Sequence, residues 1–571
     1  MRHRSFRRPA PGFRRTTAIV VTVSVAMLAA ACSSSGASGS ASSSSNNNTT
    51  LTVEASPTGP IADTFNPFLS TSPATLLGAG SMVYEPLLQY NLADANAAPI
   101  PWLATSYAFS NGDKTLTFQL RHGVTWSDGK PFTSADVAFT FNMLKQYPGV
   151  NSQDIVVTSV QTPNAHEVVL NFASPEYVNL YDIAGDTPIV PQHIWSTVGN
   201  PANYADAKPV GTGPYVVKSI TTLGIDLTKN PHYWQPGLPK VANLDYPVFD
   251  SNTSANLALE SGEIGWAGNF VPHITQVYSS QDPSHRFYAF PPFRTAYMIM
   301  NMHDYPFGDV KVRQAMSMAL DRPSVINAGE YGEQPAALSP TGLILPQQSS
   351  NLAPQYSGSN YGAPDLTSAR ALLESDGFTY KGGKLYEPNG HPFAFTIVGP
   401  SAYTDVMADF QVVADQWRQL GATVTLSGEA VNSWIEQEET GAYQVTIGGA
   451  LNNQIEDPWA SYFGLLDSAL DNPVGKVSYG DNEYFNSPQA DALLGEWATA
   501  TTAAARQQAE DGIESIMVND VPAIPLFSNV LFSEWNSSQV TGWPTTSDDY
   551  EAPSPGGEQA EVVVLHLTPA S

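Results

Sequence analysis

The residues best suited to chemistry in this chain lie together in the stretch VTIGGALNNQIEDPWASYFG. It contains three amides, two acids and an indole, namely Asn452, Asn453, Gln454, Glu456, Asp457 and Trp459. They follow an apolar, β-like run, YQVTI at 443–447, that is expected to be buried. Amides donate and accept hydrogen bonds, which suits neutral hydroxyl groups, and aromatic faces stack on sugar rings. The stretch therefore has the chemistry of a binding surface for a polar solute.

Each of these residues also has a plainer interpretation. Asparagine is frequent in turns, so the three amides are as well suited to a loop as to a ligand. Trp459 directly follows Pro458 and suits loop packing as well as stacking. Asp457 is in a position to cap a following helix. Both interpretations remain open at the level of sequence.

Catalytic chemistry has little support. Glycosidases use two carboxylates that face each other across the substrate, whereas the adjacent Glu456 and Asp457 are expected to point apart. The chain contains no Walker phosphate loop, no G-x-S-x-G elbow and no H-E-x-x-H pair, and GTGP at 211–214 lacks the third glycine of a dinucleotide fingerprint. None of the 10 histidines pairs at metal-ligand spacing. We therefore expect no enzyme, no cofactor and no metal.

Composition defines the class of protein. A chain of 571 residues exceeds what one hydrophobic core usually supports, so two or three domains are expected. With 42% hydrophobic and 14% charged residues, the body should be globular. The formal net charge of −28 repels phosphate backbones, so no nucleic acid partner is expected.

The first 50 residues differ from the rest. Residues 1–31 combine a basic start with a short uncharged segment that ends in small residues, which predicts a signal peptide. Cys32 is the only cysteine, and LAAAC resembles a bacterial lipobox, so Cys32 is expected to carry a lipid; a plain cleaved signal is the alternative. A run rich in Ser, Gly and Asn completes residues 32–50 and is expected to be a flexible tether. The protein should thus sit at the extracytoplasmic face of the bacterial cell membrane.

The elements that must position the polar stretch can be read from periodicity. Leu116, Phe118 and Leu120 alternate with polar residues and predict a half-buried strand, and Thr133 with Asp136 forms a capping-box variant that opens a helix. Apolar residues recur at helical spacing from 406 to 420, which predicts a helix with Gly421 as its C-cap, and a strand is predicted from 424. Strands that alternate with helices, without a repeat of 20 to 50 residues, indicate an α/β body with several domains.

Several of these stretches resemble one family. LRHGVTWSDGKPFTSADVAFTFNML, PVGTGPYVVKS, NPHYWQPG, FGDVKVRQAMSMALDRPSVI and DLTSARALLESDGF are similar, in this order, to segments of extracytoplasmic solute-binding protein family 5. These lipoproteins deliver oligopeptides, dipeptides, oligosaccharides or nickel to ABC importers. The resemblance covers nearly the whole chain after the signal.

The resemblance implies a two-lobed periplasmic-binding-protein fold with an extra N-terminal subdomain and a hinge between the lobes. Lobe I would comprise residues 51–84, 207–295 and 525–571, with the extra subdomain at 85–206; lobe II would comprise 296–524. It also implies the partners: an ABC permease, a small oligomeric solute and the membrane, bound by a monomer. The function implied is capture of a peptide-sized solute without chemistry, the alternatives being an oligosaccharide-specific binding protein and, less favoured, an extracytoplasmic hydrolase.

The resemblance also suggests a ligand site. Peptide-binding members place an aspartate for the peptide amine where this chain has Asn453 and Gln454, and amides cannot replace the charge. The dipeptide-binding members' arginine is missing from VGPSAYTDV. The segments GEIGWAGNF and PSAYTD instead resemble oligosaccharide-binding members. The hypothesised ligand-binding residues are Trp266, Asn269, Tyr403, Asn452, Asn453, Gln454 and Trp459.

Overall fold

The computed structural model describes residues 49–94, 97–289, 292, 294–359, 361–449, 457–500, 502–530, 532–545 and 547–570. All of these belong to one compact unit, Asn46–Ser571. Cys32 and the signal and tether segments before Thr49, as well as Asn452, Asn453 and Gln454, lie outside the described residues.

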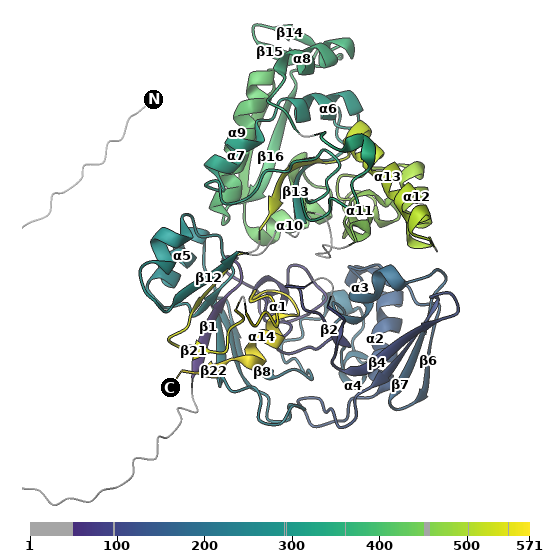
Figure 1. Ribbon diagram of the computed structural model, residues 1–571, viewed down its shortest axis with the longest axis vertical. Coiled ribbons are helices and arrows are strands. Elements are labelled where there is room, and N and C mark those ends of the chain that lie inside the picture. Colours follow the sequence, from purple (N-terminus) through teal and green to yellow (C-terminus); the bar gives the residue numbers. More distant parts are fainter. Residues whose placement is uncertain are drawn as a thin grey trace, which may run out of the picture. The chain divides into compact units, whose positions relative to one another are not determined.

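The first large sheet has seven strands and joins both ends of the described chain. Its strand order is β12-β20-β11-β1-β10-β9-β8, and β1 runs parallel to both of its neighbours, β10 and β11. In Figure 1 the purple β1 lies in the same body as the yellow C-terminal chain. The strands are β12 (His285–Ala289), β20 (Phe532–Asn536), β11 (Trp266–Ala267), β1 (Thr50–Glu54), β10 (Asn243–Pro247), β9 (Gly224–Lys229) and β8 (Tyr215–Thr221).

The second large sheet has five strands in the order β17-β16-β18-β13-β19. β16 pairs in parallel with β17 and β18, while β13 is antiparallel to β18 and β19. The strands are β17 (Thr423–Glu429), β16 (Ala394–Pro400), β18 (Val445–Gly449), β13 (Arg294–Met300) and β19 (Ile524–Asn529). The helices around it are α6 (Val310–Met318), α7 (Arg322–Ala328), α8 (Leu366–Ser375), α9 (Thr404–Leu420), α10 (Val431–Glu439), α11 (Trp459–Leu466), α12 (Pro488–Ala498) and α13 (Ala503–Asp520).

A four-stranded antiparallel sheet, β4-β5-β7-β6, forms a third unit between β1 and β8 in the chain. Its strands are β4 (Ala104–Ser110), β5 (Thr115–Leu120), β7 (Glu167–Asn171) and β6 (Ser159–Asn164). The remaining α-helices in the part of the chain described are α1 (Pro73–Leu76), α2 (Ser134–Gln146), α3 (Leu180–Ala184), α4 (Gln192–Trp195), α5 (Asn252–Glu260) and α14 (Ala560–His566), and a π-helix spans Thr275–Ser279. Short two-stranded pairs are β2 (Leu88–Gln89) with β3 (Ile100–Pro101), β14 (Thr379–Lys381) with β15 (Lys384–Tyr386), and β21 (Val540–Thr541) with β22 (Thr568–Pro569).

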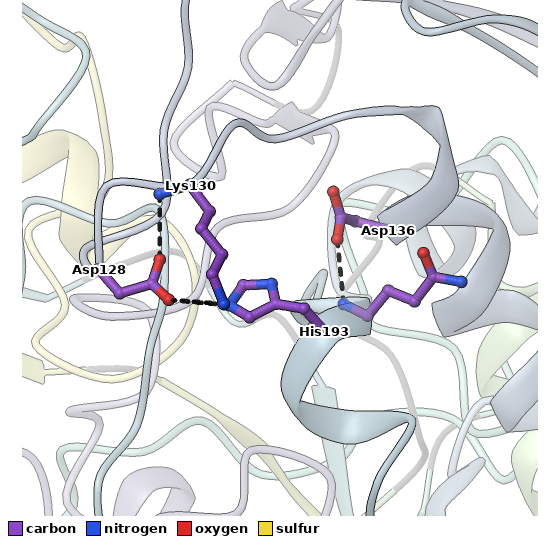
Figure 2. Close-up of polar contacts among 5 residues, drawn as sticks. Asp128, Lys130, Asp136 and His193 are labelled. Carbon is purple, nitrogen blue, oxygen red and sulfur yellow. Dashed lines mark hydrogen bonds and ion pairs between the residues drawn. The ribbon is translucent and has the colours of Figure 1, made fainter.

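The capping box predicted at the start of α2 is confirmed. Thr133 is the N-cap, and the Asp136 carboxylate accepts the backbone N–H of Thr133 at 2.9 Å. Asp136 also accepts the N–H of Gln192 at 3.0 Å, and Asp128 lies 2.9 Å from Nε2 of His193. Dashed lines mark these contacts of Asp136 and Asp128 in Figure 2. The segment that resembles the family most closely therefore ties α2 to α4 by side-chain hydrogen bonds.

The predicted periodicities are confirmed in the cores. Leu116, Phe118 and Leu120 of β5 are buried. α9 buries one apolar face against the second sheet and ends at Gly421, which adopts the left-handed conformation (φ 107°) that favours glycine. The structure is α/β, as predicted.

The chain passes from the first large sheet to the second between β12 and β13, and returns between β19 and β20. Each large sheet is therefore built from segments that are distant in sequence. The division into lobe I, extra subdomain and lobe II at the boundaries given above remains a proposal.

Candidate functional site

A cavity of about 280 Å³ opens where β13, β16, β18 and β19 meet the first turn of α9 and the helix α10. Its volume is at the lower end of the range for small-molecule sites. The walls combine a guanidinium, three carboxylates, two amides and three aromatic rings. These polar and aromatic residues are Arg294, Glu330, Asp405, Glu438, Gln334, Asn529, Tyr403, Trp434 and Phe527.

The fold explains why Tyr403 and Asp405 lie here. β16 ends at Pro400, and α9 begins at Thr404, so both residues follow the carboxyl end of a parallel strand. Ligands of open α/β sheets bind at such ends. Asp405 lies in the first turn of α9, where the helix dipole favours a negative charge.

The start of α9 and the residues just before it are held by Ser56, which follows β1, and by Asn252 of α5. Ser56 Oγ donates to the hydroxyl of Tyr403 at 2.8 Å. Asn252 donates its side-chain amide to Asp405 at 2.9 Å and its backbone N–H to the carbonyl of Ala402 at 3.1 Å. Hydrogen bonds at the edge of the cavity therefore join segments that follow strands of the two large sheets.

The aromatic side chains have defined orientations. Trp434 donates its indole N–H to Thr446 Oγ1 at 2.8 Å, and Tyr403 packs edge-on against it with ring centroids 6.3 Å apart. Because their polar atoms already have partners, the two side chains are fixed before a solute arrives. Such fixed rings offer apolar contact at low entropic cost.

The cavity contains acidic and basic side chains, and burial raises the pKa of its acids. Burial raises the pKa of Glu438 to about 8, against a hydrogen bond from Asn482 and the attraction of Arg294, both of which favour the ionised form. Burial also raises the pKa of Asp405, while backbone N–H groups and the amide of Asn252 act in the opposite direction. A cavity that combines a guanidinium with several carboxyl groups is suited to a solute that carries charges of its own.

The predicted site residues lie in different environments. Tyr403 lines the cavity. Trp266 is 0% exposed, donates its indole N–H to the carbonyl of Pro553 at 2.7 Å and packs edge-on against Trp543. Asn269 is buried and donates to the carbonyl of Asn252 at 3.4 Å. In this conformation Trp266 and Asn269 present no surface to the cavity.

Trp459 and Asp457 take the structural roles that were open at the level of sequence. Trp459 is buried, donates its indole N–H to the carbonyl of Leu494 at 3.0 Å and stacks on Phe463 at 4.7 Å. Asp457 accepts the backbone N–H of Trp459 at 3.0 Å, as a residue before a helix does. The amides at 452–454 follow β18, whose Gly448 borders the cavity, and stay a prediction.

Sequence reasoning missed Arg294, Glu330, Trp434 and Glu438. Arg294 precedes the apolar run TAYMIM, and a charge at the start of a buried strand was an available signal. Glu438 lies in the acidic run EQEE, which is typical of a solvated helix face. Only the tertiary structure brings it opposite Arg294.

Groups of metal-ligating side chains and long apolar helices are both absent from the described part of the chain. No group of three or more His, Cys, Asp or Glu residues there is arranged to hold a metal ion. Among the same residues, no helix has the length and apolarity needed to cross a bilayer.

Comparison with known proteins defines the family. The model of bacterial extracellular solute-binding proteins, family 5 Middle, matches residues 98–472, so the chain belongs to this family. The nickel-binding periplasmic protein of Escherichia coli (strain K12) is 30% identical over 394 residues, which are 66% of this chain and 71% of that protein. The glutathione-binding protein GsiB of the same strain is 26% identical over 466 residues, 79% of this chain and 85% of the relative.

Solved structures agree on the fold. A mannohexaose-bound periplasmic oligopeptide-binding protein of Thermotoga maritima superimposes with a TM-score of 0.83 and 24% identity, covering 91% of this chain and 99% of that one. The oligopeptide-binding protein AppA of Bacillus subtilis, in complex with a nonapeptide, has a TM-score of 0.76 and 20% identity, covering 92% and 100%. The two-lobed periplasmic-binding-protein fold is thereby confirmed, and the chain is a family 5 solute-binding protein of the kind that serves ABC importers.

Proposed function

We propose that this protein captures a peptide-sized solute in the cavity between β13 and α9 and delivers it to an ABC permease. The observation that carries the proposal is the pairing, in one cavity, of the Arg294 guanidinium with the carboxyls of Glu330, Asp405 and Glu438. A peptide bears a carboxylate and an ammonium group and needs partners of both signs. Arg294 would receive the carboxylate, and an acid of the cavity would receive the amine.

This assignment moves the amine partner away from the stretch at 452–454. The absence of an acid at Asn453 and Gln454 argued against peptide binding only if the amine must be bound there. Acids on α9, α10 and the turn after α7 supply the missing charge from other directions. Tyr403 and Trp434 would cover the apolar part of the solute.

Delivery requires that the bound and free states differ in shape. The hydrogen bonds from Ser56 to Tyr403 and from Asn252 to Asp405 join segments of the two proposed lobes at the edge of the cavity. Solute contacts to Tyr403 and Asp405 would strengthen the same junction, so binding would favour closure. We further propose that a lipid on Cys32 and the tether to residue 50 hold the monomer beside its permease.

An oligosaccharide is the second candidate. The amides of Gln334 and Asn529, the rings of Tyr403 and Trp434, and the amide run at 452–454 are suited to hydroxyl groups and sugar faces. A neutral sugar would nevertheless leave the buried carboxyl of Glu330 without a partner of opposite charge, which is costly when this group is ionised. We therefore place the peptide first.

Native mass spectrometry of the full chain after signal removal, followed by calorimetric titration, tests the proposal. The probes are a tripeptide, the same tripeptide with an amidated C-terminus, and a mannose oligomer. We expect the free acid to bind, and Arg294→Gln to weaken it about tenfold or more without affecting the amide. Arg286→Gln, an exposed arginine on β12, is the matched control. Titration by the mannose oligomer alone would establish the second candidate instead.

A further inference from the structure

Glu330 is a buried acid with an unused hydrogen-bonding atom at the cavity wall. It follows the C-terminus of α7 and is 2% exposed, yet it lines the cavity. Its Oε2 atom has no hydrogen-bond partner among the described residues. A buried, unsatisfied carboxylate oxygen is costly, so its retention calls for a partner that the protein alone does not provide.

Asp409 on α9 lies next to the chain segment that contains Glu330. Asp409 is 0% exposed, neither of its carboxyl oxygens has a hydrogen-bond partner among the described residues, and its pKa is raised to about 10 by burial and then by the charge of Glu330. A proton held by Asp409 removes the repulsion between the two carboxyl groups, so that Glu330 can keep the negative charge. The two segments are in close contact: a Cβ on Gly329 would lie 2.1 Å from Oδ1 of Asp409 and 2.6 Å from the carbonyl oxygen of Asp405.

The charges around Glu330 are mostly negative. Asp405 on α9 raises the pKa of Glu330 after burial, and Glu333 contributes in the same direction from the following turn. The amide of Gln334 lines the same part of the cavity, and its Oε1 already accepts the N–H of Val530 at 2.6 Å. Arg294 is the cationic residue among the described residues that line the cavity.

We propose that Glu330, with Asp405 beside it, binds a cationic group of the solute, a primary ammonium or guanidinium, and that Asp409 is a positioning residue for Glu330. The proposal rests on solute capture in this cavity and names its class: a peptide with a lysine or arginine side chain. A long cationic side chain would place its charge against Glu330 and leave the peptide carboxylate to Arg294. The group that Glu330 would recognise is the ammonium group, and an amino sugar carries this group as well as a lysine-containing peptide.

Two matched pairs of probes separate the effect of the ammonium group from the effect of the rest of the probe. The peptide pair is Ala-Lys-Ala and Ala-norleucine-Ala, which differ in the ammonium group at nearly equal length. The sugar pair is a glucosamine trimer and its N-acetylated form. Titration calorimetry of the full chain after signal removal, at pH 8 and low salt, gives the ratio of affinities within each pair without any variant.

We expect Ala-Lys-Ala to bind about tenfold or more tightly than Ala-norleucine-Ala, and Glu330→Gln to remove this difference. Asp409→Asn should shift the pH at which the preference appears, a readout that a purely structural role would not move. Glu374→Gln, an exposed acid on α8, is the control that should leave the ratio unchanged.

The outcomes separate the two proposals. Preference for the amino sugar over its acetylated form, without peptide binding, supports Glu330 as an ammonium partner and overturns the peptide function. Equal binding of the two peptides, or a ratio unaffected by Glu330→Gln, overturns the inference while the peptide function stands. Failure of all four probes to bind the parent protein overturns both.

Discussion

The pair of acids at the end of the first large sheet provides the sharpest stability prediction. Glu54 on β1 and Glu534 on β20 are both paired in register with Ala267 on the intervening β11. Glu54 is 2% and Glu534 0% exposed, and none of their four carboxyl oxygens has a hydrogen-bond partner among the described residues. We predict that Glu54→Gln stabilises the protein at pH 8 and leaves its stability nearly unchanged at pH 5.

The magnitude follows from linkage between protonation and folding. Burial raises the pKa of Glu54 from 4.5 to about 8, so the folded state binds more protons than the unfolded state in this window. The stability contributed by Glu54 is therefore present below pH 4.5 and is lost as the pH rises towards 8. At 1.36 kcal/mol per pKa unit, the free energy of unfolding lost at pH 8 through the raised pKa of Glu54 is at most about 4 kcal/mol. Structural relaxation and water entry should reduce it to about 1 to 3 kcal/mol.

Urea denaturation of the parent and variant at pH 5 and pH 8, with thermal unfolding as a second probe, measures the difference. Glutamine keeps the shape of the side chain and removes the charge, so the variant should gain about 1 to 3 kcal/mol at pH 8 and less than about 1 kcal/mol at pH 5. Glu374→Gln on the solvated face of α8 should show neither effect. A loss of stability at pH 8 would mean that Glu54 is ionised and paired in the folded protein. Equal changes at both pH values would mean that the pKa of Glu54 does not differ between the folded and unfolded states, and either result would refute the reasoning.

Three further predictions concern the cavity and its surroundings. Trp266→Ala should destabilise the protein by about 3 to 5 kcal/mol in urea denaturation, because the substitution leaves a cavity in the core. The folded variant should keep its affinity for the solute. A loss of affinity at unchanged stability would instead mean that the solute stacks on Trp266. Ser56→Ala should weaken solute binding about fivefold in calorimetry, because it removes the hydrogen bond to Tyr403. The double variant Ser56→Ala, Tyr403→Phe should bind as weakly as Ser56→Ala alone. Additive losses would mean that the two residues do not act through this hydrogen bond. The affinity for Ala-Lys-Ala should fall between pH 8 and pH 6. Burial and then the charge of Asp405 raise the pKa of Glu330 to about 7, so Glu330 is protonated in this range and no longer attracts the lysine ammonium group. A flat pH profile that matches that of Ala-norleucine-Ala would contradict this prediction.

The local structure was largely predictable because it depends on neighbours in the chain. The alternation of Leu116, Phe118 and Leu120, the capping box of Thr133 and Asp136, and the glycine stop of α9 each involve residues within a few positions of one another. Family membership was equally accessible, since the motifs that define it are continuous segments.

The role of individual polar side chains was less accessible. An indole in a polar stretch has the same sequence signature whether it stacks on a solute or fills a core. Trp459 and Trp266 prove to be buried, with their N–H groups bonded to the carbonyls of Leu494 and Pro553. Burial depends on which strand or helix covers the ring, and this is set by residues far away in the chain.

By itself, the sequence determined the α/β class, the family and the absence of the usual catalytic motifs. The tertiary structure alone decided the charge of the candidate site. Arg294, Glu330, Asp405 and Glu438 come from β13, the turn after α7, the start of α9 and α10, and they share one cavity only because the second large sheet brings these ends together. Long-range packing, rather than spacing along the chain, sets which charges face each other in a low-dielectric space, and therefore which solute the cavity favours.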